Sequence, residues 1–240
     1  MIELKNVTYK IGEKAQEKII LDDISCVFDD NCLIAITGHN GSGKSTLTKL
    51  IMGIVKPTSG QILFNGQDIT NLSIDKRAKM GINYAFQQPI LFSGITVKDL
   101  IDIATGESNS VPKACEYLSK VGLCAKEYVN RDFDKTLSGG EQKRIELALA
   151  LAKKGECLIF DEPEAGIDLW SFEKLNSLFT KDRCFIVVSH QEKLLKVADK
   201  ILVMKNGKID QYDSSKKVLK TLNSPTCARI KGGNKWKWMQ

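Results

Sequence analysis

Gly38-His39-Asn40-Gly41-Ser42-Gly43-Lys44-Ser45-Thr46 is the stretch that decides the fold, and it stands between apolar runs at 32–36 and 47–52. This order predicts a buried strand, a glycine-rich turn and the start of a helix. Glycines let the backbone fold into a nest of NH groups, and a helix N-terminus adds unpaired NH groups and partial positive charge. The stretch therefore predicts a loop that binds phosphate groups.

The last residues of this loop carry the chemistry of a nucleoside triphosphate site. Lys44 would bring a full positive charge to the β and γ phosphates, and the Ser45 hydroxyl suits Mg²⁺. A glycine-rich turn without a ligand is the alternative, but it leaves Gly-Lys-Ser at a strand-to-helix junction unexplained. His39 has no expected role.

The charge of the chain lies mainly at its C-terminus. The net charge is +6, but seven Lys or Arg and no Asp or Glu follow Asp213, which leaves −1 for residues 1–213. This distribution argues against a basic nucleic-acid-binding surface on the main body. The basic tail, with Trp236 and Trp238, is either a solvated terminus or a segment that binds an acidic partner, anionic lipid or nucleic acid.

The cysteines and apolar runs bear on location. Seven cysteines are scattered singly, without a C-x-x-C pair, which indicates reduced thiols rather than disulfides or a zinc site. Residues 1–5 lack the profile of a signal peptide, and no apolar run approaches the roughly 18 residues of a membrane span. We expect a cytoplasmic protein with no membrane span of its own, peripheral at a membrane if it serves a transporter.

Strand and helix patterns alternate along 240 residues, which predicts one α/β domain. Strands are predicted over 2–9, 19–28, 32–36, 82–86, 157–160, 185–188 and 201–204, with hairpin turns at Asn65-Gly66 and Asn206-Gly207. Helices are predicted over 47–52, 75–80, 97–104, 112–121 and 141–153. We expect a mostly parallel sheet in a core of about 1–88 and 156–222, a helical subdomain over about 89–155, and a basic tail over about 223–240.

Polar side chains follow two of the predicted strands. Asp161 and Glu162 come after 157–160, and His190 comes after 185–188. The carboxyl ends of parallel strands share one edge of a sheet, where a nucleotide binds. We expect Asp161 to hold Mg²⁺, Glu162 to polarise the attacking water and His190 to contact the γ-phosphate. An acidic turn and a packed histidine are the alternatives for each motif taken alone.

Ser138-Gly139-Gly140-Glu141 precedes the longest helical pattern. Ser138 and Glu141 fit a capping box, which is a purely structural interpretation. Two glycines at a helix start also expose NH groups to an anion. Because the chain has its own phosphate loop, we expect this second cradle to serve the ATP of another subunit. Tyr9, an aromatic ahead of the loop, is a candidate for stacking on adenine, with strand packing as the alternative.

Together these residues resemble the ATP-binding-cassette (ABC) ATPases over nearly the whole chain. The resemblance implies a P-loop NTPase fold with a RecA-like core sheet, an antiparallel β subdomain and an inserted helical subdomain. It implies ATP and Mg²⁺ as ligands, and a head-to-tail dimer with a second copy or a homologous ATPase subunit. The implied ATP-binding residues are Tyr9, Gly38, Asn40, Gly41, Ser42, Gly43, Lys44, Ser45, Thr46, Ser138, Gly139, Gly140 and Asp168. The implied Mg²⁺ ligands are Ser45, Gln87 and Asp161, and hydrolysis is assigned to Glu162, His190, Gln87 and Lys44.

Within this family several stretches resemble SufC, the ATPase of SUF-type iron-sulfur cluster assembly: 65–72, 77–82, 85–89, Asn130-Arg131, and Lys143-Arg144 with Glu146. Glu141, where transporter ATPases usually have Gln, also fits SufC, whereas Asp161-Glu162-Pro163 is transporter-like. The resemblance implies a cluster-assembly ATPase with a soluble SufB/SufD-like scaffold as partner. The alternative is the nucleotide-binding subunit of a membrane ABC transporter. DNA-associated cassettes carry long insertions that are missing here, so nucleic acid is not an expected partner.

Overall fold

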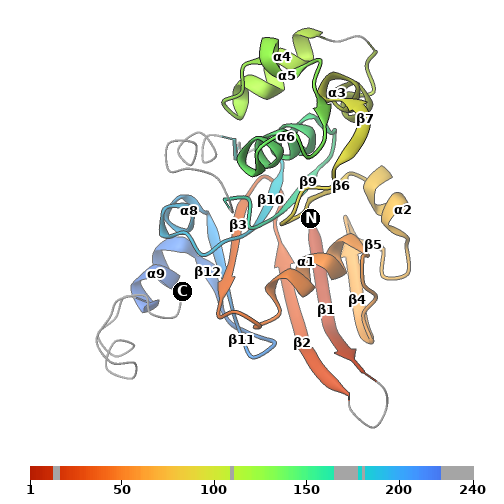
Figure 1. Cartoon of the computed structure of the whole chain (residues 1–240). Coiled ribbons are helices and arrows are strands. Elements are labelled where there is room, and N and C mark those ends of the chain that lie inside the picture. The colour runs from red at the N-terminus through yellow and green to blue at the C-terminus, as the bar shows by residue number, and fades with distance from the viewer. Residues whose placement is uncertain (13–16, 109–110, 165–177, 180–181, 223–240) are drawn as a thin grey trace.

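The computed structural model describes residues 1–12, 17–108, 111–164, 178–179 and 182–222 (Figure 1). Its main sheet has six strands in the order β12-β11-β3-β10-β9-β6. Neighbouring strands run parallel except at the edge, where β12 is antiparallel to β11. This confirms the predicted sheet. Its strands are β3 (Leu33–Gly38), β6 (Ile82–Ala85), β9 (Cys157–Asp161), β10 (Cys184–Val188), β11 (Lys200–Lys205) and β12 (Lys208–Ser214).

Strand β3 is buried on both faces, and its side chains alternate between two apolar cores. Leu33 and Ala35 belong to the first core, which also contains residues of the helices. Ile34 and Ile36 belong to the second core. Successive side chains of a strand point to opposite faces, so a central parallel strand needs a continuous apolar run. Because both cores hold β3, the loop that follows Gly38 leaves the sheet from a fixed point.

The second core joins helix α1 (Lys44–Met52) to an antiparallel sheet of order β2-β1-β4-β5. Leu47 and Leu50 of α1 share this core with Ile2 and Leu4 of the sheet. The Asn65-Gly66 turn has φ angles of 51° and 79°, as a tight hairpin requires. The predicted antiparallel subdomain is therefore present. Its strands are β1 (Ile2–Ile11), β2 (Lys18–Phe28), β4 (Ser59–Phe64) and β5 (Gln67–Asp68).

Helix α2 (Ile74–Lys79) contributes a fully buried arginine to the second core region. The Arg77 guanidinium donates to the carbonyl oxygens of Leu50 (2.7 Å) and Ile51 (2.8 Å) at the end of α1. It also donates to the carbonyl oxygens of Thr70 (2.9 Å) and Leu72 (3.1 Å). Carbonyl groups at a helix C-terminus have no partner within the helix. Arg77 therefore links the C-terminal end of α1 to the loop at 70–72, which precedes α2.

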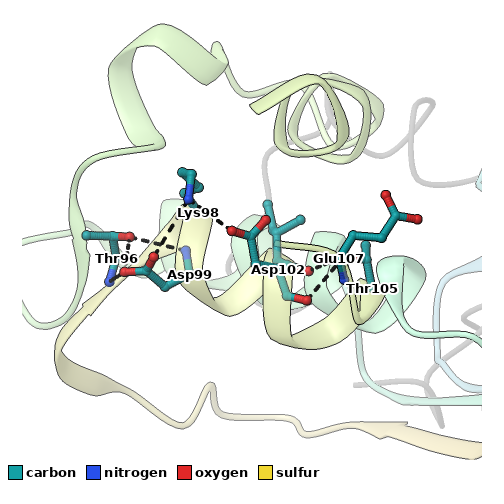
Figure 2. A network of polar contacts seen from close by, with 7 residues as sticks. Thr96, Lys98, Asp99, Asp102, Thr105 and Glu107 are labelled. Carbon is teal, nitrogen blue, oxygen red and sulfur yellow. Dashed lines mark hydrogen bonds and ion pairs between the residues drawn. The ribbon is translucent and has the colours of Figure 1, made fainter. Parts of the chain in front are cut away.

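Four helices between residues 89 and 155 make up the helical subdomain, drawn yellow to green at one end of the molecule in Figure 1. Its helices are α3 (Val97–Thr105), α4 (Val111–Lys120), α5 (Ala125–Tyr128) and α6 (Gly139–Ala152). Thr96 and Asp99 form a capping box at the start of α3, beside the Lys98–Asp102 ion pair of 2.9 Å (Figure 2). The apolar spacing of the sequence predicts three of these four helices, namely α3, α4 and α6.

The same segment differs from the sequence-based expectation in two short strands, β7 (Phe92–Thr96) and β8 (Asp132–Phe133), which pair with each other. Strand β8 is too short to show any alternation, and its partner lies far away in the sequence. The four-residue helix α5 is equally short. Both depend on tertiary contacts rather than on local propensity.

The first core is continuous between the helical subdomain and the main sheet. It contains Ile101 and Ala148 of the subdomain together with Phe160 and Phe185 of the sheet. Helices α8 (Glu192–Val197) and α9 (Ser215–Leu222) contribute to the same core. No helix within the described ranges has both the length and the apolar character of a bilayer span.

Candidate functional site

The phosphate loop has a backbone that glycine alone fits at two positions. Gly38 has a φ of 141°, and a Cβ atom there would lie 2.1 Å from the Met204 carbonyl oxygen. Gly43 has a φ of 98°, and a Cβ atom there would lie 2.6 Å from Cδ2 of Leu21. Residues that carry a side chain rarely adopt positive φ angles of this size, so the glycines of the local sequence determine the shape of the loop.

Lys44 begins α1 and is almost fully buried. Its Nζ donates to the carbonyl oxygens of Gly38 (2.9 Å) and His39 (3.0 Å), which holds the ammonium group across the loop. Burial lowers the pKa of Lys44, and the carboxylates of Glu162 and Asp161 oppose that shift. A partly dehydrated cation in this position attracts an anion strongly.

The loop opens onto a cavity of about 390 Å³. Its walls are made by the phosphate loop, by the start of α1, and by two side chains that follow β6 and β9. The lining residues are Asn40, Gly41, Gly43, Lys44, Ser45, Thr46, Gln87 and Glu162. Loop NH groups, one ammonium group and one carboxylate therefore face the same space.

Ser45 and Asp161 meet where α1 passes the end of β9. The Ser45 hydroxyl donates to Oδ1 of Asp161 over 3.0 Å. The Tyr84 hydroxyl, on β6, donates to Oδ2 of the same carboxylate over 3.0 Å and lies 3.2 Å from Oγ1 of Thr48. A hydroxyl and a carboxylate side by side are the hard oxygen ligands that Mg²⁺ prefers, so the residues present fit this ion.

Glu162 and Gln87 form a direct pair inside the cavity. The Gln87 amide Nε2 donates to Oε2 of Glu162 over 2.6 Å. Glu162 has a φ of 49°, a left-handed conformation that is uncommon for a residue with a side chain. Because it directly follows β9, this conformation turns the chain out of the strand at the sheet edge.

His190 follows β10, and neither ring nitrogen has a hydrogen-bond partner within the described part of the chain, although both are buried. Burial lowers the pKa of His190, and the charge of Lys44 adds to the shift. Buried polar atoms are normally paired. The preceding residue, Ser189, donates to the buried carboxyl group of Glu164, whose pKa burial raises. His190 itself lies outside the cavity lining.

The helix-start motif has the capping box that the sequence predicts. Oε2 of Glu141 accepts from the Ser138 NH over 2.6 Å, and Oγ of Ser138 accepts from the Glu141 NH over 3.4 Å. Tyr128 donates to Oε1 of Glu141 over 2.6 Å, and this bond together with those from Ser138 lowers the pKa of Glu141 to about 2. The prediction that Ser138 and Glu141 form a helix cap is therefore confirmed.

Several other predicted residues do not line the cavity. Tyr9 lies on β1 and packs against the second core, outside the cavity lining. Ser138, Gly139 and Gly140 lie at the start of α6 and are also outside the lining. Asp168 and the tail over 223–240 lie outside the described residues.

Sequence reasoning missed several residues that hold the site together. The sequence pattern predicts Tyr84 only as part of a strand, although a hydroxyl in an otherwise buried strand indicates a polar neighbour. Lys143 and Glu146 enter the prediction only through the SufC resemblance, yet an i, i+3 charge pair on a buried helix face needs a partner there. Glu164 lies two residues after Glu162, and no local pattern predicts its role, because its partner Ser189 lies on another loop.

Comparison with known proteins places the chain in a family. The family model described as ABC transporter matches residues 21–165. An ABC transporter ATP-binding protein of Methanocaldococcus jannaschii, itself uncharacterised, is 38% identical over 211 residues, which cover 83% of this chain and 84% of that protein. The energy-coupling factor transporter ATP-binding protein EcfA2 of Caldanaerobacter subterraneus is 32% identical, covering 91% of this chain and 81% of the relative.

Solved structures agree in fold. The dimeric cassette MJ0796, described as a bacterial ABC transporter cassette, superposes with a TM-score of 0.82 at 26% identity, covering 90% of this chain and 99% of the cassette. A dimeric post-hydrolysis state of the same cassette, bound to ADP and Pi, has a TM-score of 0.80 at 26% identity and the same coverage. The fold, the phosphate cavity and these similarities agree: the chain belongs to the ABC ATPases, the family of ATP-binding and ATP-hydrolysing cassettes.

Proposed function

We propose that this chain is the ATP-hydrolysing subunit of a membrane transporter and that the cavity at Lys44 and Glu162 is its catalytic site. The observation that carries the catalytic part is the 2.6 Å bond between Gln87 and Glu162, which sets a carboxylate beside the phosphate loop. The relatives reported above, which are transporter ATP-binding proteins, support the transport part.

Each side chain then has a role in attack of water on the γ-phosphate. Glu162 takes a proton from the water as general base, and Gln87 orients that carboxylate. Lys44 and the neutral imidazole of His190 donate to the phosphate oxygens as negative charge develops. Ser45 and Asp161, with Gln87, would hold Mg²⁺, which when bound neutralises charge on the β and γ phosphates. Tyr9 would stack on the adenine base.

The second half of each site would come from another subunit. Ser138, Gly139 and Gly140 begin α6 but do not line the cavity of their own chain. A helix N-terminus with two glycines suits an anion, so these residues can cover the ATP of a partner. The dimers formed by the MJ0796 cassette support this arrangement. ATP binding would close such a dimer and hydrolysis would open it.

An iron-sulfur cluster assembly ATPase of the SufC type is the second candidate function. The observation that favours it is Glu141, which accepts bonds from Tyr128 and Ser138 as a carboxylate, where transporter cassettes usually carry Gln. The names of the relatives favour the transporter. The two functions differ in the partner, which is a membrane protein anchoring this chain peripherally in one case and a soluble SufB/SufD-like scaffold in the other.

An affinity purification distinguishes the two. The chain carrying Glu162→Gln, with ATP present, is recovered from its native cells, and proteins from soluble and detergent-extracted fractions are identified by mass spectrometry. Recovery with a polytopic membrane protein supports the transporter. Recovery with a soluble protein that accepts an iron-sulfur cluster supports the assembly ATPase and contradicts the transporter. The parallel control is Lys44→Ala, which removes the phosphate contact.

A further inference from the structure

Helix α6 carries a buried ion pair that the chemistry above does not use. Lys143 and Glu146 are 2.9 Å apart, and their side chains are 2% and 12% exposed. They lie one turn apart on α6, whose first turn begins with the Ser138-Gly139-Gly140 motif. Taking two charges out of water costs several kcal/mol unless other polar groups surround them. The partners of this pair therefore matter.

Those partners are the backbone groups just after β6. Oε1 of Glu146 accepts from the Phe86 NH over 2.9 Å. Nζ of Lys143 donates a short bond to the Phe86 carbonyl oxygen and a second bond of 3.3 Å to the Gln87 carbonyl oxygen. The pair thus engages both polar backbone groups of Phe86 and the carbonyl of Gln87. Strand β6 ends at Ala85, so these groups lie beyond its ladder.

The contacts form a continuous connection from α6 to the cavity. Lys143 and Glu146 hold the Phe86–Gln87 backbone, and the Gln87 side chain donates to Glu162 over 2.6 Å. None of these contacts involves the phosphate loop or Lys44. A change in the Phe86–Gln87 backbone would therefore move Gln87, the partner of the Glu162 carboxylate and a proposed Mg²⁺ ligand, without moving the phosphate loop or Lys44.

We propose that Lys143 and Glu146 are positioning residues that set Gln87 against Glu162 and so sustain the rate of hydrolysis. The inference rests on the proposed role of Glu162 as general base. Two apolar residues would fill the same space with equal or better stability. An ion pair supplies what apolar residues cannot, namely a fixed position for two carbonyl groups and one NH group.

The test uses the double variant Lys143→Met/Glu146→Leu, because Lys143→Met alone leaves a buried carboxylate without its counter-ion. The purified chain is assayed for ATP affinity in the absence of Mg²⁺ by equilibrium binding, for kcat, and for its thermal midpoint. We expect an affinity within about twofold of wild type and a kcat at least about tenfold lower, since small misplacements of catalytic groups are costly. Lys143→Arg, which keeps the donors, should restore part of kcat when Glu146 is present.

The control is Lys98→Met on α3, which removes the 2.9 Å pair with Asp102 in the same subdomain and should leave kcat within about twofold of wild type (Figure 2). The Gln87→Ala background gives a second test. There the double variant should lower kcat by less than about twofold further, because both changes act through Gln87.

A folded double variant with wild-type kcat, or an undiminished loss of kcat in the Gln87→Ala background, would overturn the inference. Glu162→Gln is assayed alongside. If that variant keeps its activity, the proposed general base is wrong, whatever the double variant does.

Discussion

The hydroxyl of Tyr84 donates to Oδ2 of Asp161 over 3.0 Å, while the Ser45 hydroxyl donates to Oδ1 of the same carboxylate over 3.0 Å. The carboxylate is held from both sides, and burial raises the pKa of Tyr84 far above its usual value. Tyr84 therefore remains a donor at every physiological pH. A residue outside the cavity lining thus fixes the orientation of a proposed metal ligand.

Tyr84→Phe removes that bond and keeps the ring. We expect the Mg²⁺ concentration for half-maximal ATPase activity to rise by about tenfold, as for other residues that orient metal ligands. Electron paramagnetic resonance of Mn²⁺ with a non-hydrolysable ATP analogue measures the same loss without turnover. Tyr117→Phe, on α4, is the matched control. An unchanged ion affinity would remove Tyr84 from this role.

Glu162→Gln tests the general base. The amide is nearly isosteric but takes up no proton, so turnover should fall by about 100-fold or more while ATP still binds. ATPase assays and size-exclusion chromatography with ATP measure the loss and the trapped dimer. Glu156→Gln, an exposed change just ahead of the same strand, is the control. Wild-type turnover in the Glu162 variant would assign the base elsewhere.

Ser138→Arg tests whether two chains share each site. A long cation at the start of α6 should prevent ATP-dependent dimerisation, since the side chain would occupy the space of the partner's phosphates. Analytical ultracentrifugation with ATP, in the Glu162→Gln background, measures the dimer. The exposed Ser119→Arg on α4 serves as control. Normal dimerisation of the Ser138 variant would contradict a shared site.

Arg77→Leu tests the hydrogen bonds that link the end of α1 to the loop at 70–72 before α2. The change leaves buried carbonyl groups at the end of α1 without donors, and we expect the free energy of unfolding to fall by about 3 kcal/mol. Urea denaturation measures it. The exposed neighbour Lys76→Met should change stability by less than about 0.5 kcal/mol. Equal stability of the Arg77 variant and wild type would show that water replaces the guanidinium.

Glu141→Gln tests the pH dependence of the α6 cap. The folded-state pKa of Glu141 is about 2, below its ordinary value of 4.5, because the carboxylate accepts from Tyr128 and Ser138. Its stabilisation is thus fully present above about 4.5 and is lost as pH falls toward 2. We expect wild type to be more stable than the variant by about 1 kcal/mol at pH 7. The difference, measured by urea denaturation, should shrink below pH 4.5; a constant difference would contradict a charged cap.

Much of this arrangement follows from local sequence. The shape of 38–46 depends on glycines at fixed positions, and the apolar run of β3 has the continuity of a strand buried on both faces. The pairing of Gln87 with Glu162 could not be predicted, since it depends on the relative placement of two loops after β6 and β9. The bonds of Tyr84, Lys143 and Glu164 are likewise long-range. Their donors and acceptors are visible in the sequence, but their distances come from the sheet order.

The cellular role depends on a few residues that differ between branches of the family. Glu141 and its neighbours favour SufC, whereas the names of the relatives favour transporter ATPases. The capping box explains why this position is a weak discriminator. A carboxylate at Glu141 stabilises the helix start through Ser138 and Tyr128 whether or not a scaffold protein is present.

The alternation of side chains along β3 gives the two faces of the main sheet separate apolar cores. One face, with Ile34 and Ile36, packs on α1, whose first residues line the cavity. The other face, with Leu33 and Ala35, shares its core with the helical subdomain. Substitutions on the first face should therefore disturb the packing of α1, whose start lines the cavity, whereas substitutions on the second should disturb the packing of the helical subdomain on the sheet.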